Sequence, residues 1–281
     1  SNADGEAIVG TVSGTSISFG TAVTFESASS GINYIATAYD ANAEKVVIAY
    51  QDGDDSNYGK AIVGTVSGTS ISFGTAATFE SADTQHISAT YDANAQKVAI
   101  FYQDRGNSYA GTGIVGTISG TSISFGSPAT FLASQAWNMS SSYDSGSQKI
   151  VVIYSDRNTA GSNTWHGNLV VGTISGTSIS FGSPLVYEAA YTAYSQDIAY
   201  DANAQRHGII YADGGNSYYG TAIVAEAVGT NLTSENFIGF AENDCTDNGL
   251  ATIQLGGLVN DKQTSLTAGQ TYFVQTDGTI G

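Results

Sequence analysis

Acidic side chains are the residues of this chain best suited to chemistry, because aspartate and glutamate number 25 against eight lysines and arginines. Hydrolysis of a glycosidic bond needs two carboxyl groups about 5 to 9.5 Å apart across a sugar. Asp197 and Glu188 are the best such pair, since Asp197 stands where similar segments of the chain carry a small residue. We treat this pair as an alternative hypothesis and expect no catalytic residues.

Metal-ligating residues lack the required spacing. The three histidines do not follow a zinc pattern. Asp52, Asp54, Asp55 and Asn57 offer oxygen atoms to calcium, but the run lacks the glycine and distal glutamate of an EF-hand loop. Cys245 is the only cysteine and has acidic neighbours, which do not activate a thiol. We therefore expect neither a metal nor a cofactor.

A repeated word, GTVSGTSISFG, indicates the elements that position these side chains. Its phenylalanine recurs at Phe19, Phe73, Phe125 and Phe181, so the period is 54, 52 and 56 residues. Repeats of this length cannot bury an apolar face alone and need neighbours to form a core. The period is typical of propeller blades and solenoid turns.

Each repeat contains four runs with strand character. In the second copy these runs cover residues 70–79, 86–91, 97–103 and 113–118, and Gly, Asn, Asp or Ser turns separate them. The third run is apolar on both faces, which indicates a strand in a sheet that packs between two other sheets. We expect antiparallel four-stranded blades and almost no helix.

The predicted fold is an all-β propeller of five blades in one domain, residues 4–281. The domain is taken to begin at residue 4 because Ser1 to Ala3 look like a cloning remnant. Strands expected at 232–242, 250–255 and 272–275 would form the fifth blade together with the N-terminal strand, which protects the open sheet edges. The alternative is an open array of four repeats with a separate C-terminal hairpin domain. The predicted blades cover residues 14–66, 67–118, 119–174, 175–228, and 229–281 with 7–12.

Two connections of each repeat differ between the copies, whereas the others are nearly constant. They follow the first and the third predicted strands, so they lie at the same end of the blades when strand direction alternates. These connections also gather aromatic residues, including Tyr34 and His86, whose polar edges suit sugars or protein partners. The predicted ligand-binding residues are Trp137, Trp165, His166, Tyr191, Tyr194 and Tyr218.

Aspartates recur in the turns of every copy. Asp40, Asp92, Asp144 and Asp201 open the turn between the second and third strands, where aspartate bonds nearby backbone amides. A second turn resembles the Asp box of sialidase-like propellers, Asp-x-Gly-x-x-aromatic, which in that family is a structural turn. The residues that match it are Asp104, Gly106 and Tyr109, and again Asp213, Gly215 and Tyr218.

The net charge of −17 excludes nucleic acid and anionic membranes as partners, because phosphate binding draws its affinity from lysine and arginine. The sequence also has no apolar stretch long enough to span a bilayer. We expect no membrane insertion. The acidic balance keeps a tyrosine-rich surface soluble.

The repeat words resemble those of repeat-bearing virion proteins of marine bacteriophages, notably phages of cyanobacteria. The same resemblance covers Asn236 to Glu242 (NFIGFAE) and Leu266 to Gly278 (LTAGQTYFVQTDG). It implies a tail-fibre or other exposed structural protein on a virion or cell surface, with a host glycan or surface protein as partner and other virion proteins as possible neighbours. The alternatives are a carbohydrate-active enzyme and a purely structural spacer.

Overall fold

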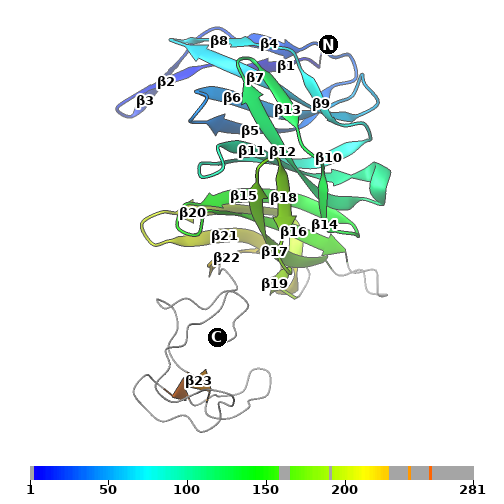
Figure 1. The fold of residues 1–281 in the computed structure, drawn as a ribbon, viewed down its shortest axis with the longest axis vertical. Coiled ribbons are helices and arrows are strands. Elements are labelled where there is room, and N and C mark those ends of the chain that lie inside the picture. Colours follow the sequence, from blue (N-terminus) through cyan, green and yellow to red (C-terminus); the bar gives the residue numbers. More distant parts are fainter. Residues whose placement is uncertain (1–2, 158–164, 190–191, 228–239, 242–252, 255–281) are drawn as a thin grey trace, which may run out of the picture. The chain divides into compact units, whose positions relative to one another are not determined.

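The computed structural model describes residues 3–157, 165–189, 192–227, 240–241 and 253–254. Residues 1–227 form one compact unit and residues 228–281 a second one. Within the described ranges the chain is all-β, as predicted, and its only helical segments are two 3-10 turns, η1 (Arg105–Asn107) and η2 (Gly214–Asn216). Successive antiparallel sheets of the first unit follow one another in chain order (Figure 1).

Three full sheets share one topology. Two long strands lead into a third, and the fourth position is divided between two short strands that both pair with the third. The first full sheet contains β5 (Ile32–Asp40), β6 (Lys45–Asp52), β7 (Tyr58–Ser67), β8 (Ser70–Phe73) and β9 (Ala77–Glu80). The second contains β10 (Thr84–Asp92), β11 (Lys97–Asp104), β12 (Ala110–Ser119), β13 (Ser122–Phe125) and β14 (Ala129–Leu132). The third contains β15 (Ala136–Asp144), β16 (Lys149–Arg157), β17 (Trp165–Ser175), β18 (Ser178–Phe181) and β19 (Leu185–Glu188).

Partial sheets stand at both ends of this series. We call the first the N-terminal half-sheet, which consists of two strand pairs, β1 (Gly5–Ala7) with β4 (Val23–Glu26) and β2 (Gly10–Ser13) with β3 (Ser16–Phe19). We call the other the last sheet, which consists of β20 (Thr192–Asp201), β21 (Arg206–Asp213) and β22 (Tyr219–Ala225). In the second unit, β23 (Phe240–Ala241) pairs with β24 (Ile253–Gln254).

The predicted repeat boundaries are wrong by one strand. Each Ser-Ile-Ser-Phe strand pairs with the strand before it, as in β7 and β8, where Ser67 lies opposite Ser70. The two residues between them begin with Gly68 at φ +61°, which makes a tight hairpin that forces this pairing. The sheets therefore cover residues 32–80, 84–132 and 136–188 rather than 14–66, 67–118 and 119–174. Residues 7–12 lie in the half-sheet, beside β3 and β4.

The core lies between neighbouring sheets, and the two faces of each central strand enter different layers. On β6, Val47 and Ala49 pack in the layer that contains Val98 and Ile100 of β11. On β11 itself, Ala99 and Phe101 pack on the opposite side with Ile150 and Val152 of β16. This arrangement confirms the prediction of burial on both faces for β6, β11 and β16, whereas the fourth such strand, residues 206–213, leaves Ile210 exposed on one face.

In each layer between neighbouring sheets, a tyrosine of one sheet reaches the sheet before it. The ring of a buried tyrosine in one sheet packs against an aromatic ring of the sheet before it, with ring centroids 5.1 to 5.4 Å apart. The pairs are Phe25 with Tyr50, Phe79 with Tyr102, Phe131 with Tyr154, and Tyr187 with Tyr211. Three of the hydroxyls donate to a glutamate of the preceding sheet: Tyr50 to Glu26 (2.8 Å), Tyr102 to Glu80 (3.0 Å) and Tyr211 to Glu188 (3.0 Å). Burial raises the pKa of each tyrosine.

Backbone contact fixes how closely two sheets approach. A Cβ atom on Gly74 would lie 1.9 Å from the carbonyl oxygen of Thr121 in the next sheet, and Gly126 stands in the same relation to Thr177. Only glycine permits this approach. The residue after the repeated phenylalanine is therefore glycine for a steric reason.

The described residues do not form a closed ring. Ile17 and Phe19 on the N-terminal half-sheet, and Ile210 and Val224 on the last sheet, are exposed side chains on outward sheet faces. Of the strands predicted to close the ring, 232–242 and 250–255 coincide only in part with β23 and β24, and 272–275 lies outside the described residues.

Candidate functional site

The variable connections that the structure describes lie along one edge of the sheets, as predicted. Backbone hydrogen bonds join them: Gly53 N donates to Gly31 O at 3.0 Å, and Arg105 N donates to Asp83 O at 3.0 Å. Similar bonds link neighbouring sheets, since Thr84 N donates to Asn57 O at 3.0 Å. We call this the loop edge, comprising residues 27–31, 53–57, 81–83, 105–109, 133–135 and 214–218.

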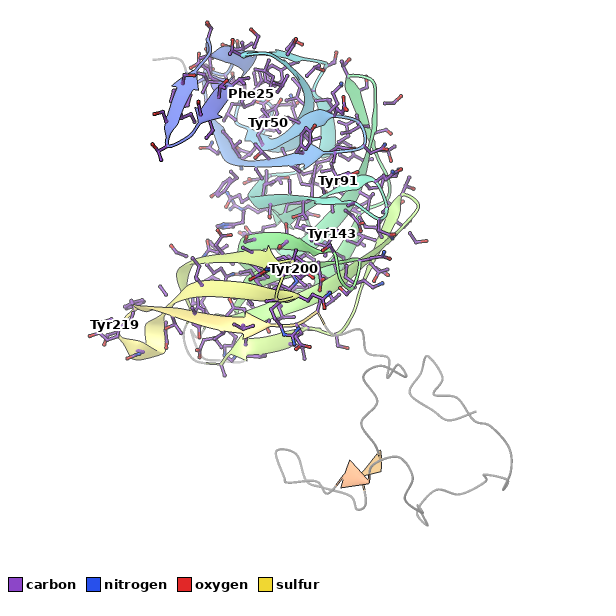
Figure 2. The ribbon with its side chains drawn as sticks, turned by 90° about the vertical axis from the view of Figure 1, so that its left-hand side faces the viewer. Phe25, Tyr50, Tyr91, Tyr143, Tyr200 and Tyr219 are labelled. Atoms are coloured by element: carbon purple, nitrogen blue, oxygen red, sulfur yellow. The ribbon has the colours of Figure 1, made fainter. Side chains whose placement is uncertain are left out.

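The opposite edge, which we call the turn edge, carries the repeated aspartate turns at residues 40–44, 92–96, 144–148 and 201–205. Asp92 accepts hydrogen bonds from Asn94 N and Ala95 N, both at 2.9 Å, and the other three aspartates do the same. A tyrosine of the following sheet reaches each internal turn: the Tyr143 hydroxyl accepts from Asn94 N at 3.2 Å. The corresponding tyrosines of successive sheets, Tyr91, Tyr143 and Tyr200, are labelled in Figure 2.

Four ring side chains stack along the loop edge, and we call them the aromatic row: Tyr34, His86, Trp137 and Trp165. Their ring centroids lie 5.1, 4.9 and 5.2 Å apart in that order. The members come from β5, β10, β15 and β17, so three successive sheets contribute to one continuous surface. The contact of Trp137 with Trp165 is edge to face, at an interplanar angle of 83°.

A β-bulge near the start of the first strand of each full sheet positions this row. The pairing of β5 with β6 slips between Asn33 and Ala36, and β10 and β15 slip at the matching residues. Tyr34 and His86 adopt φ of 49° and 51° there, which re-aims their side chains toward the edge. Sequence reasoning placed both residues at this edge but left them out of the predicted site. Their shared repeat position was the available signal.

The aromatic row is partly buried. Tyr34 is exposed at one end and donates a hydrogen bond to Gln85 Oε1 at 3.3 Å, whereas the other three rings are half-buried. Burial lowers the pKa of His86 to about 4, so this imidazole is neutral at physiological pH. His86 Nε2 and Trp137 Nε1 are buried without a hydrogen-bond partner among the described residues.

The two predicted Asp-box turns are 3-10 turns at the loop edge. Asp104 accepts from Asn107 N at 3.1 Å and caps η1, which contains Gly106. Tyr109 follows at φ 65°, with the Arg105 guanidinium 5.2 Å from its ring. In the last sheet Asp213 accepts from Gly215 N at 2.9 Å and Asn216 N at 3.1 Å, and Tyr218 follows. The aspartates of these turns hold the loop backbone.

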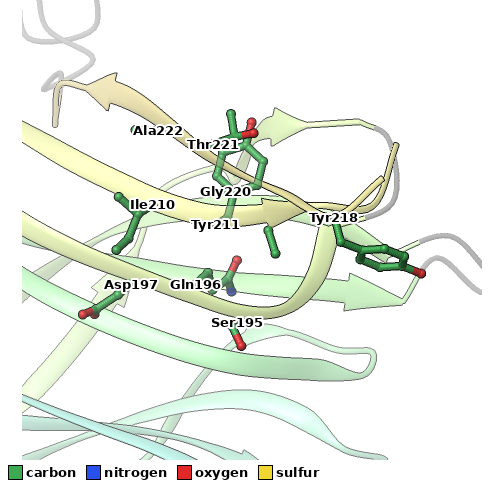
Figure 3. A pocket seen from close by; sticks show the side chains of 10 residues that line it. Ser195, Gln196, Asp197, Ile210, Tyr211, Tyr218, Gly220, Thr221 and Ala222 are labelled. Atoms are coloured by element: carbon green, nitrogen blue, oxygen red, sulfur yellow. The ribbon is translucent and has the colours of Figure 1, made fainter. Parts of the chain in front are cut away.

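A hollow of about 550 Å³ lies over the last sheet (Figure 3). Ile210, Ala212 and Ala222 contribute its apolar floor, and Gln196, Asp197 and Thr221 contribute polar groups. Tyr218, one of the predicted ligand-binding residues, stands at its side near the loop edge (Figure 3).

The other predicted ligand-binding residues are placed as follows. His166 is half-buried on β17, opposite Asp156, next to Trp165 of the aromatic row. Tyr194 lies in β20, but its side chain is outside the described residues. Tyr191 is wholly outside them. The structure thus brings together Trp137, Trp165 and the backbone of His166, and puts Tyr218 on a different sheet.

The alternative catalytic pair has separate structural partners. Asp197 accepts from the Ser140 hydroxyl at 2.6 Å, and Glu188 accepts from the Tyr211 hydroxyl at 3.0 Å. Asp197 lines the hollow, whereas Glu188 is not among its lining residues. Each carboxyl group is therefore engaged in joining two sheets.

The acidic turn considered for calcium is held by protein groups. Asp54 accepts from the backbone amides of Ser29 and Ser30, both at 2.7 Å, and these hydrogen bonds lower its pKa. Lys60 pairs with Asp52 at 2.7 Å and with Asp55 at 2.9 Å. In the part of the chain that the structure describes, no group of three or more His, Cys, Asp or Glu residues could hold a metal ion.

Comparisons with known proteins add no family. No protein-family model matches the sequence, and no curated protein matches it. Within the described ranges, no helix has the length and apolar character needed to cross a membrane.

Proposed function

We propose that this chain is a recognition module, not an enzyme, and that it binds a host glycan or surface protein through its loop edge. The observation that carries the proposal is the aromatic row, to which three successive sheets contribute. A row built across sheets behaves as one surface because the packed layers beneath it are rigid. Loops displayed on such a scaffold are the usual place for binding.

The chemistry of the row suits a carbohydrate. Aromatic rings with a polar edge offer flat apolar area for a sugar ring and a donor or acceptor for its hydroxyls. The Tyr34 hydroxyl is such a group, whereas Trp137 Nε1 and His86 Nε2 are buried without a partner among the described residues, a cost that structural clusters usually avoid. The exposed Tyr34 gives access from one end of the row. A glycan is therefore the first ligand to test, and a protein the second.

We also propose that the stacked sheets are blades of a β-propeller. Supporting this are their nearly identical antiparallel topology and the contacts between the first strands of neighbouring sheets, β5 with β10, β10 with β15 and β15 with β20. In a propeller the first strand of each blade lies nearest the axis, where neighbouring blades meet. The count of five blades remains a prediction.

The proposed location is a virion or an extracellular surface. It is supported by the resemblance of the repeat words to phage virion proteins. The chain is also acidic and has few lysines and arginines, which disfavours nucleic acid as a partner. Contact with other virion proteins is part of the same proposal.

A glycan array with the full chain tests this function. Trp165→Ala and Tyr34→Ala, at the two ends of the aromatic row, should each lower binding at least about tenfold, as loss of a stacking ring does at hot spots. Tyr39→Ala is the matched control, because Tyr39 is an exposed tyrosine beside the Asp40 turn on the opposite edge. Unchanged binding in both row variants would contradict the proposal and favour a spacer. Turnover of a bound glycan that Asp197→Asn abolishes would favour the enzyme.

A further inference from the structure

The two ends of the stacked series expose sheet faces that are buried everywhere inside it. On the N-terminal half-sheet, Ile17 and Phe19 are 54% and 60% exposed. On the last sheet, Ile210 and Val224 are 59% and 73% exposed. Apolar side chains grouped on a regular sheet face mark an interaction surface.

The internal copies show what normally covers the first of these faces. Ile123 and Ile179 occupy the repeat position of Ile17, and both are buried. Ile123 packs in one layer with Val47 and Ala49, which belong to the sheet before it. The face that carries Ile17 is therefore shaped to receive a preceding sheet.

The internal copies also show what covers the second face. Ala49, Phe101 and Ile153 occupy the repeat position of Ile210, and none of them has any exposed surface. Phe101 packs in one layer with Ile150 of the sheet that follows it. The face that carries Ile210 is therefore shaped to receive a following sheet.

We propose that these two faces bind each other between two copies of this chain, so that the half-sheet of one copy docks on the last sheet of another. Among the described residues of one molecule the two faces are exposed and do not cover each other, so the propeller proposed above would close through a second copy and not within one chain. The contact would repeat the kind of interface that already joins neighbouring sheets four times inside the chain. The hollow beside Ile210 offers room for the apolar side chains of the incoming half-sheet (Figure 3).

The two faces are different surfaces, which makes the contact heterologous. A heterologous contact continues from copy to copy and produces rings or open chains instead of a two-fold dimer. This property allows a test with complementary variants. Phe19→Asp removes only the first face, and Ile210→Asp removes only the second.

The experiment is sedimentation of the full chain over a range of concentrations. Wild type should rise above the monomer mass of 28.9 kDa with concentration, and each variant alone should remain at that mass or form only traces of larger species. An equal mixture of the two variants should form a one-to-one complex, because each partner keeps one intact face. Val186→Asp is the control, since Val186 is exposed at a position that is also exposed in the other copies, and this variant should associate like wild type.

Three outcomes would overturn the proposal. The first is wild type that stays monomeric at every concentration, and the second is a variant mixture that fails to associate although both variants give native circular dichroism. The third is a monomer whose melting temperature falls with Ile210→Asp. That result would mean that the chain's own residues cover the last sheet.

Discussion

The buried hydroxyl of Tyr154 has no hydrogen-bond partner among the described residues, because Leu132 occupies the position from which a glutamate accepts this bond in the other copies. Glu80 is the matching residue for Tyr102, at 3.0 Å. The third full sheet thus keeps the tyrosine of the repeat, whereas the second full sheet has a leucine at the acceptor position.

Tyr102→Phe and Tyr154→Phe should consequently differ in their effect on stability. The first change removes a hydrogen bond to a carboxylate and should lower the free energy of unfolding by about 1.5 kcal/mol. The second removes a buried group without a partner and should leave that free energy unchanged or raise it by up to about 1 kcal/mol. Urea denaturation measures both values, and equal losses would contradict the explanation.

Leu132→Glu should supply the missing acceptor. We expect a gain in stability with Tyr154 present and a loss in the Tyr154→Phe background, because the new carboxylate then lacks its donor. A double-mutant cycle by urea denaturation gives the coupling, which should be about 1 kcal/mol. A coupling near zero would show that the repeat geometry does not carry over to this site.

Gly74→Ala should destabilise the protein by about 3 kcal/mol, because the new methyl group would strike the Thr121 carbonyl oxygen of the next sheet. Gly182→Ala is the matched control. A Cβ there meets no described atom closer than 3.9 Å, although Gly182 occupies the same repeat position. Thermal denaturation compares the two variants, and a tolerated Gly74→Ala would mean that the sheets can move apart.

Tyr143→Phe should cost about 1 kcal/mol, because its hydroxyl accepts a hydrogen bond from Asn94 N in the turn of the preceding sheet. Tyr39 has the same repeat position in the first full sheet, where the half-sheet before it has no such turn, and it is exposed. Tyr39→Phe should therefore have no effect. Urea denaturation of both variants is the measurement, and a cost at Tyr39 equal to that at Tyr143 would argue against the contact between sheets.

His86 should make stability depend on pH between about 6.5 and 4. Burial lowers its pKa to about 4, so as pH falls the unfolded chain takes up this proton before the folded chain does. Falling pH therefore favours unfolding, by about 2 kcal/mol across that window after allowance for partial exposure. His86→Asn, which copies Asn138 at the same repeat position, should flatten this part of the curve.

His207 limits how flat that curve can become. It is fully buried, and burial lowers its pKa in the same direction, so the His86→Asn variant should keep a residual slope. Measuring the free energy of unfolding of wild type and variant at several pH values separates the two contributions. Identical slopes would show that His86 titrates normally and that the aromatic row is open to water.

Strands, aspartate turns and the shared edge of the variable loops could be predicted, because alternation and turn chemistry are local properties of the sequence. The pairing of the Ser-Ile-Ser-Phe strand was missed, although the two-residue Gly-Thr link at Gly68 indicates a hairpin. The aromatic row could not be predicted in full. It depends on bulges that put Tyr34 and His86 at positive φ. Non-glycine residues rarely adopt this conformation, and the sequence does not indicate where they do.

The near identity of the layers between sheets also bears on how such a chain changes in length. Since a sheet packs on the one before it and the one after it, removal or duplication of one whole 52- to 56-residue unit would recreate an interface of the same kind. Lineages could therefore gain or lose units by recombination within the repetitive gene, and would alter the extent of the aromatic row without redesigning the interior.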